Sequence, residues 1–120
     1  MKSFTDIEQS RRLAEILPIE SADMWYLPIK RNEKVYYDLT VHCSPTRGII
    51  PAWSLSALLS ILPSVIKRKG KRMYLTLEKA GAYNLYYKSP DRLDELWETK
   101  EEPVDTCYNM IVKLKEMKLL

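Results

Sequence analysis

The densest cluster of similar functional groups in the sequence is a run of five cations within residues 67–72. They are Lys67, Arg68, Lys69, Lys71 and Arg72, and Tyr74 follows them. Closely spaced cations attract a phosphate backbone, and a nearby tyrosine ring can stack on a base. Phosphate contacts alone carry no sequence information. With Gly70 in the run, the sequence favours a solvated cationic turn between a helix and a strand, and a nucleic-acid-binding loop is the alternative.

Tyrosine and tryptophan side chains form a second set of candidates. Tryptophan is over-represented among the anchors of protein interfaces, so Trp53, Trp97 and Tyr36 are assigned to a protein partner. Trp53 precedes an apolar helix but falls on its serine side and not on its leucine stripe. It therefore either packs against neighbouring residues in the core or anchors a partner on the surface.

Three further tyrosines lie in a predicted strand at residues 83–87. Alternation along a strand places Tyr83 and Tyr87 on one face and Tyr86 on the other. Together with Tyr74 across a hairpin, these rings could offer a stacking surface for single strands. Cross-strand aromatic packing is the simpler interpretation, and it requires at least one of the rings to be buried.

Nucleophilic and metal-ligating residues are sparse. His42 is the only histidine, Cys43 follows it, and Cys107 is distant in the sequence. Adjacent residues at a strand end point to opposite faces, and a zinc site here would need a further carboxylate. The sequence also contains no glycine-rich phosphate loop and no Gly-x-Ser-x-Gly motif. We therefore predict no catalytic residue, no metal and no cofactor, with a small enzyme built on His42 and Cys43 as the least favoured alternative.

The composition is that of a soluble globular protein. The chain has 120 residues, of which 46% are hydrophobic and 29% charged, and this length predicts one domain spanning residues 1–120. A net charge of +3 is mild, so polyanion binding would depend on local clustering. Pro51 and Pro63 interrupt the uncharged stretch at residues 48–66, which therefore predicts buried core and no membrane span. The N-terminal residues lack an apolar signal-peptide region, which favours reduced thiols and a cytoplasmic location.

The elements that would position these side chains follow from periodicity and from capping residues. A helix capped by Thr5 and Glu8 is expected to end near Leu17. Two hairpins, a central helix and a last helix follow. The predicted strands are 24–29 with 35–41 and 73–77 with 83–87; the predicted helices are 54–62, a short acidic one from Ser89 through Trp97, and one that begins at Pro103. This order predicts an α+β domain in which two hairpins form one mostly antiparallel sheet of about four strands with helices packed on it.

Three blocks of the chain resemble a known family. They are residues 4–18 (Phe-Thr-Asp-Ile-Glu-Gln-Ser leading into Leu-Ala-Glu-Ile-Leu-Pro), residues 51–59 (Pro-Ala-Trp-Ser-Leu-Ser-Ala-Leu-Leu), and residues 103–114 (Pro-Val-Asp leading into Met-Ile-Val-Lys-Leu). The chain resembles a family of small uncharacterised proteins from gut anaerobic bacteria, often found in phage-like or mobile-element contexts. The resemblance implies a bacterial cytoplasmic accessory protein and transfers no site residues.

Three hypotheses about function follow from these observations. The leading one is a non-enzymatic interaction module of a mobile element, which binds a protein partner or itself through an aromatic surface or an exposed sheet edge. The second is a nucleic-acid-binding accessory protein that uses residues 67–72 with nearby tyrosines. The third is the enzyme at His42 and Cys43. The first is weakened if Trp53 is fully buried and the chain stays monomeric with no partner, and the second requires salt-dependent binding that disappears when the charges are reversed.

Overall fold

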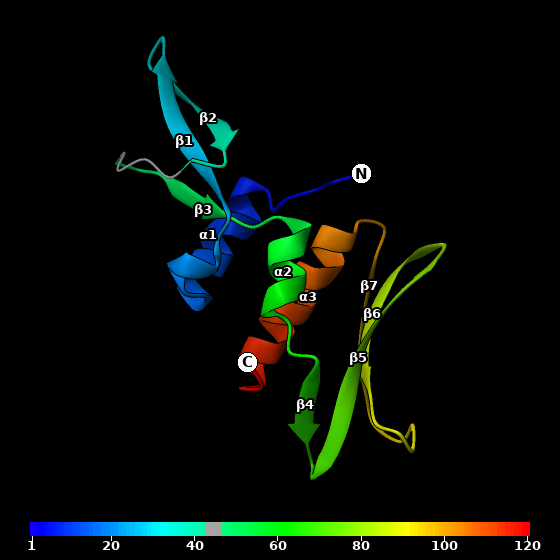
Figure 1. The fold of residues 1–120 in the computed structure, drawn as a ribbon. Helices are drawn as coiled ribbons and strands as arrows, with labels where there is room; N and C mark the ends of the chain where they lie inside the picture. Colours follow the sequence, from blue (N-terminus) through cyan, green and yellow to red (C-terminus); the bar gives the residue numbers. More distant parts are fainter. Residues whose placement is uncertain (43–46) are drawn as a thin grey trace.

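The computed structural model describes residues 1–42 and 47–120 (Figure 1). Its elements, in chain order, are α1 (Ile7–Ile16), the 3₁₀ turn η1 (Ile19–Ser21), β1 (Met24–Arg31), β2 (Lys34–Thr40), β3 (Ile50–Ala52), α2 (Leu55–Ile61), β4 (Val65–Arg68), β5 (Lys71–Ala80), β6 (Ala82–Lys88), β7 (Glu95–Lys100) and α3 (Pro103–Glu116). Single helices alternate with groups of antiparallel strands along the chain. The predicted α+β class is confirmed.

The two predicted hairpins lie in separate sheets. One sheet has three strands in the order β2-β1-β3, and the other has four in the order β4-β5-β6-β7. Figure 1 shows the three helices between them, with the β1–β2 hairpin projecting beyond α1. The expectation of a single sheet is therefore corrected. Alternation shows which residues of a hairpin face a core, but it does not show whether two hairpins share that core.

The segment from Ser89 to Trp97 is the clearest error in the predicted secondary structure. It forms a turn followed by β7, which pairs antiparallel with β6 from Tyr83↔Lys100 to Lys88↔Glu95. Asp91 accepts hydrogen bonds from the Ser89 hydroxyl and the Leu93 N–H, and these close the turn. Apolar residues at 93, 96 and 97 fit a helix as well as a strand end, and pairing with β6 decides for the strand.

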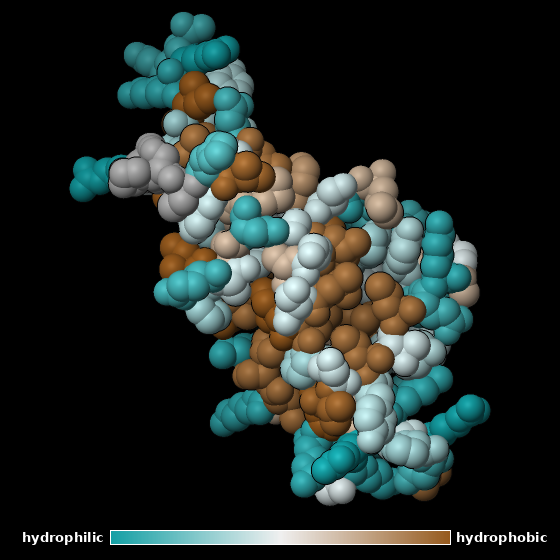
Figure 2. Space-filling view, viewed as in Figure 1, coloured by the Kyte–Doolittle hydropathy of each residue, from teal (hydrophilic) through white to brown (hydrophobic). Residues whose placement is uncertain are grey.

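The main core lies between α3 and the four-stranded sheet. It holds Leu13 from α1, Leu58 from α2, Met73, Leu85 and Tyr87 from the sheet, and Val104, Cys107, Met110, Ile111 and Leu114 from α3. The last helix begins at Pro103 as predicted, and its apolar stripe faces the sheet. Figure 2 shows apolar side chains gathered around the middle of the molecule and hydrophilic ones toward the ends of the hairpins. We call the sheet face that α3 covers the inner face.

A smaller core lies between α1 and the three-stranded sheet. Tyr26, Ile50 and Ala52 are buried there, with Phe4 and Ile7 packed against them. The predicted capping box of α1 is displaced by one residue, because Asp6 and Gln9 form it in place of Thr5 and Glu8. Thr5 is instead fully buried, and its hydroxyl lies 2.7 Å from that of Ser10.

The N-terminal segment joins the two halves of the fold. The Thr5 N–H donates to the Trp53 carbonyl (2.9 Å), and the Trp53 N–H donates to the Thr5 hydroxyl (3.1 Å). Tyr26 on β1 donates its hydroxyl hydrogen to the Thr5 carbonyl at 2.6 Å. These buried bonds fix the point where β3 passes into α2, and α2 in turn places β4 at the edge of the larger sheet.

Candidate functional site

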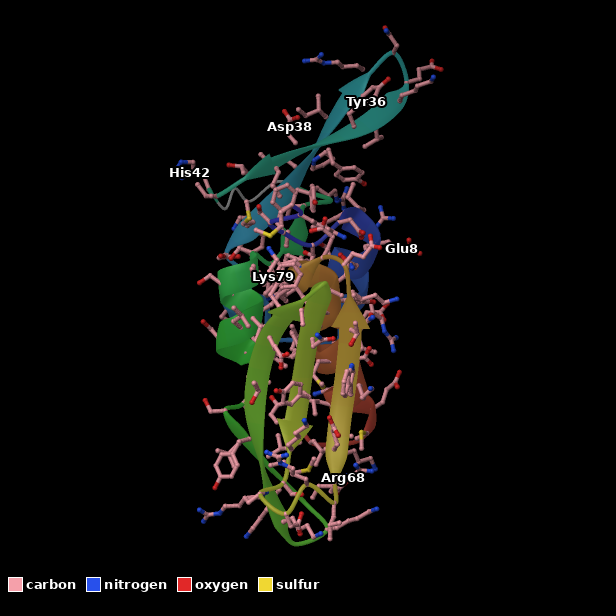
Figure 3. The ribbon with its side chains drawn as sticks, turned by 90° about the vertical axis from the view of Figure 1, so that its right-hand side faces the viewer. Glu8, Tyr36, Asp38, His42, Arg68 and Lys79 are labelled. Atoms are coloured by element: carbon pink, nitrogen blue, oxygen red, sulfur yellow. The ribbon has the colours of Figure 1, made fainter. Side chains whose placement is uncertain are left out.

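One face of the four-stranded sheet is covered by helices and the other is not. The uncovered face, which we call the outer face, is turned toward the viewer in Figure 3, and no helix among the described residues lies over it. Alternation along the strands sends large polar, aromatic and cationic side chains to this side. These side chains are Lys67 on β4, Arg72, Tyr74, Thr76 and Glu78 on β5, Asn84, Tyr86 and Lys88 on β6, and Glu95, Trp97 and Thr99 on β7.

The aromatic centre of the outer face is formed by neighbouring strands. Thr76, Tyr86 and Trp97 are in register across β5, β6 and β7. The rings of Tyr86 and Trp97 lie 6.0 Å apart between centroids, with their planes inclined by 35°. Trp97 remains 50% exposed, and Tyr74, two residues before Thr76, is 46% exposed. The face thus presents ring surface to solvent over three adjacent strands.

Polar contacts hold the Tyr86 ring in place. Its hydroxyl lies 3.1 Å from Glu78 Oε2, and this hydrogen bond to the carboxylate raises the pKa of Tyr86. Lys88 Nζ sits 4.4 Å from the centre of the same ring, a cation–π contact. The ammonium group also approaches Glu95 at 3.7 Å. The Tyr86 ring is therefore held in place by Glu78 and partly covered by Lys88, while Tyr74 and Trp97 are the more accessible aromatic side chains.

The basic run forms a β-hairpin, where a loop had been predicted. Arg68 pairs with Lys71 in register, and Lys69 and Gly70 between them both have positive φ (53° and 76°). Such a two-residue turn fits the right-handed twist of the flanking strands. Lys67 and Arg72 are the next pair in the ladder, so their side chains lie together on the outer face, one row from Tyr74.

The hairpin divides the five cations into two groups. Arg68 donates to Asp94 Oδ1 at 3.1 Å, and Lys71 approaches Asp91 Oδ2 at 2.9 Å. Hydrogen bonds from Ser89, Lys71 and the Leu93 N–H lower the pKa of Asp91, so it stays ionised beside the lysine. These two cations fasten the β4–β5 turn to the β6–β7 turn and serve a structural role.

The remaining cations are available at the surface. Lys67, Lys69 and Arg72 are exposed, and none of them forms an ion pair with any residue that the structure describes. They concentrate positive charge at the end of the outer face near the β4–β5 turn. Glu78 lies toward the opposite end, while Glu95 shares the row of Tyr74 and is paired with Lys88. Of the residues predicted to bind nucleic acid, only these three cations and Tyr74 therefore remain as candidates.

The residues predicted to bind a protein partner do not share one surface. Trp53 is 0% exposed, and its indole N–H donates to the Ser21 hydroxyl at 3.0 Å. Of the two interpretations for Trp53, the structure supports burial, so its role as a surface anchor is corrected. Trp97 lies on the outer face, whereas Tyr36 lies on the projecting β1–β2 hairpin (Figure 3).

Tyr36 borders a hollow on the three-stranded sheet. The hollow has a volume of about 370 Å³ and is lined by Ile29, Arg31, Asn32, Tyr36 and Asp38. It contains one cation and one carboxylate beside the tyrosine ring. Its lining gives no nucleophile paired with a base, so it adds no catalytic chemistry to the described chain.

The least favoured prediction was an enzyme built on imidazole and thiol groups, and these groups are not brought together in the described part of the chain. His42 is exposed just after β2. Cys107 is fully buried, and burial raises the pKa of its thiol to about 12, so it is protonated at neutral pH. The prediction for Cys43 concerns a residue outside the described ones. Among residues 1–42 and 47–120, no group of three or more His, Cys, Asp or Glu side chains could hold a metal ion.

Two contributors to the outer face were missed in the sequence. Lys88 lies over Tyr86 from two residues further along β6, and Thr99 accepts a hydrogen bond from the Trp97 indole. The predicted strand ended at residue 87, one short of Lys88, and the assignment of residues 89–97 to a helix hid the strand that carries Thr99. The alternation of Glu95, Trp97 and Thr99 with Leu96 and Glu98 was the available signal.

No protein-family model, curated protein or solved structure matches this chain. None of the helices in the described residues has the length and apolarity that crossing a membrane requires. Function is therefore inferred from the geometry and charge of the outer face.

Proposed function

We propose that the chain is a non-enzymatic accessory protein that binds single-stranded nucleic acid on the outer face of the four-stranded sheet. Bases stack on Tyr74 and Trp97, and the backbone phosphates contact Lys67, Lys69 and Arg72. The observation that carries the proposal is that the exposed ring of Trp97, which is distant in the sequence, shares one open sheet face with the exposed Tyr74 and with Lys67 and Arg72, two cations that form no ion pair with the described residues. In keeping with the resemblance, we place the protein in the bacterial cytoplasm and in a mobile-element context.

Stacking on the outer face favours single strands over duplexes. Bases in a duplex are already stacked on each other, so exposed rings such as Trp97 gain contacts only from unpaired bases. Base–aromatic stacking contributes about 1–3 kcal/mol per base and tolerates any base sequence. The cations add an attraction that weakens with salt. The expected activity is binding with little sequence preference.

The position of the cations supports the same interpretation. Lys67 and Arg72 form the row next to that of Tyr74 on the outer face, because residues 67 and 72 are directly paired across β4 and β5. A nucleic-acid strand that stacks a base on Tyr74 brings its next phosphate toward Lys67 and Arg72. Glu78 lies beyond the rings at the opposite end, where it disfavours phosphate. The nucleic-acid backbone should therefore bind at the end of the outer face near Lys67 and Arg72.

A protein partner on the outer face is the alternative. Trp97 and Tyr74 are exposed aromatic side chains of the type that anchors interfaces. With Trp53 buried, however, the predicted anchors are reduced to Trp97 and Tyr36, which lie in different sheets. Cations grouped at one end of an aromatic face fit a polyanion better than they fit an apolar protein surface.

The test is fluorescence anisotropy with labelled single-stranded DNA, single-stranded RNA and a matched duplex across a salt series. The variants are Trp97→Thr, Tyr74→Thr and the pair Lys67→Ser with Arg72→Ser. The matched control replaces Arg11 and Lys30, two exposed cations away from the outer face, with serine and removes the same charge.

We expect tighter binding to single strands than to the duplex, weakened by each outer-face variant and retained in the control. Equal losses of affinity in the control and in the Lys67/Arg72 variant would mean that binding depends only on the net charge of the protein. No binding at low salt would overturn the proposal, because backbone attraction is strongest there.

A further inference from the structure

The β1–β2 hairpin exposes an edge strand with apolar side chains on both of its faces. Val35 is 53% exposed and Tyr36 is 54% exposed, and consecutive residues of a strand point to opposite sides. The hairpin projects beyond α1 in Figure 1, so the helix that covers the base of this sheet does not cover its tip. β2 is the last strand of its sheet, with β1 as its partner. Exposed edges of this kind are templates for pairing with another strand.

The turn of the hairpin determines which backbone groups of β2 face outward. Asn32 and Glu33 both have positive φ (51° and 66°), and they join the pair Arg31↔Lys34. In a two-residue hairpin the pair that flanks the turn exchanges hydrogen bonds, and such pairs alternate along the ladder. Lys34, Tyr36 and Asp38 therefore direct their N–H and C=O groups to β1. Val35, Tyr37 and Leu39 direct theirs away from it.

Antiparallel pairing of β2 with a second β2 is complementary in one register. When Tyr36 lies opposite Tyr36 of the other copy, Lys34 lies opposite Asp38, and Val35 lies opposite Tyr37. Val35 and Tyr37 both have outward backbone groups, so this pair can form the hydrogen bonds. Lys34 and Asp38 lie on the same face, so each copy places a cation beside a carboxylate of the other.

Neighbouring registers lose this match. Moving the centre to Val35 or Tyr37 keeps the outward groups paired, but it places Lys34 opposite Tyr36 or Thr40. Centres at Lys34 or Asp38 place like charges opposite each other. The edge strand β4 shows the contrast, because its charged residues Lys67 and Arg68 are both cations and self-pairing would bring positive charges together.

The geometry points to a symmetric dimer of this chain, formed by antiparallel pairing of the two β2 strands about Tyr36. The two three-stranded sheets become one continuous sheet of six strands, with an ion pair between Lys34 and Asp38 on either side of the symmetry axis. The contact is isologous and closes on itself, so it gives a dimer and no filament. It uses a surface separate from the outer face of the four-stranded sheet.

Sedimentation velocity over a concentration series tests the dimer. We expect the wild-type chain to dimerise, and Lys34→Asp and Asp38→Lys each to be monomeric, since either change opposes like charges at two places. An equimolar mixture of these two variants should associate, because every facing pair then has opposite charges. The double variant Lys34→Asp/Asp38→Lys should regain the homodimer. Lys115→Asp, the same charge change at an exposed site on α3, is the control.

A backbone variant makes the test independent of charge. Val35→Pro removes an N–H that points away from β1, so the hairpin keeps its internal ladder while the dimer loses a hydrogen bond on each side. Circular dichroism confirms the fold of each variant. A wild-type chain that stays monomeric up to its solubility limit would overturn the inference. So would dimerisation that the single charge variants leave unchanged, which would place the contact elsewhere.

Discussion

Tyr86 and Trp97 lie side by side on adjacent strands, 6.0 Å apart between ring centroids, on the face of the sheet that α3 does not cover. Aromatic pairs of this kind contribute about 0.5–1.5 kcal/mol beyond their burial. The opposite face of the same strands holds the buried Leu85, Tyr87 and Leu96. Because core and candidate site occupy opposite faces of the same strands, stability and binding can be separated by mutation.

Trp97→Thr is the sharpest test of that separation. The free energy of unfolding should fall by about 0.5–1.5 kcal/mol, because the aromatic contact is lost while threonine suits a strand. Affinity for a single strand should fall by about 1–3 kcal/mol through the loss of one stacking site. Urea unfolding and anisotropy measure the two quantities. A variant with normal affinity would remove Trp97 from the binding face.

The Lys67→Ser/Arg72→Ser pair should change the salt dependence of binding. For single strands the slope of log K against log salt is about −0.7 per neutralised phosphate, so removal of two contacts should flatten it by about 1.4. Arg68→Ser should instead destabilise the β4–β5 turn, because Arg68 is bound to Asp94. A salt slope unchanged by the double substitution would mean that these cations do not contact phosphate.

Thr5→Val tests the joint between the N-terminal segment and α2. The substitution preserves shape but leaves the buried Trp53 N–H without its acceptor, and a lost partner for a buried donor costs about 1–3 kcal/mol. Chemical denaturation should show that decrease. Thr76→Val on the exposed face is the comparison, for which a change within about 0.5 kcal/mol is expected.

Asp105→Asn should flatten the acid limb of the stability profile. Burial alone would raise the pKa of Asp105, but hydrogen bonds from Lys2 and Gln9 (both 2.8 Å) lower it overall. A lowered pKa contributes stability above the ordinary carboxyl pKa, and that stability is lost as the pH falls through the lowered value. The variant should lose about 1 kcal/mol at neutral pH and little in acid. Equal losses at both pH values would exclude this linkage.

Cys107 should report global unfolding. Its thiol is fully buried and its pKa is raised to about 12 by burial, so it is neither accessible nor ionised in the native protein. In a Cys43→Ser background, alkylation near neutral pH should be slow, and its rate should rise with urea in parallel with the loss of circular dichroism. Fast alkylation of the folded chain would contradict the burial of α3 against the sheet.

The elements that local pattern determines were predicted correctly. The helix at residues 54–62, the opening of α3 at Pro103 and the pairing of the two strands of the first hairpin all depend on residues close in sequence. The opposite placement of Tyr86 and Tyr87 also followed from alternation. These features need no knowledge of what packs against them.

Features that depend on distant partners were not predicted. The wheel of the short helix left Trp53 either buried or exposed, and its burial is decided by the N-terminal segment and Ser21, which contact it from elsewhere in the chain. The role of each cation in the basic run depends on Asp91 and Asp94, which bind Lys71 and Arg68 from twenty or more residues away in the sequence. Whether two hairpins share a sheet is likewise a question of tertiary packing.

The attachment of Lys2 to α3 has a consequence for biosynthesis. The Lys2 N–H donates to Glu102, 100 positions later, and its ammonium group donates to Asp105. On the ribosome, the strands of the small sheet emerge long before α3 does, so that sheet can form while the larger core lacks its covering helix. The leucine side of α2 then stays exposed until translation supplies residues 103–116. Nascent chains of this protein should therefore be clients of chaperones that bind apolar segments during elongation, and release should coincide with the docking of α3.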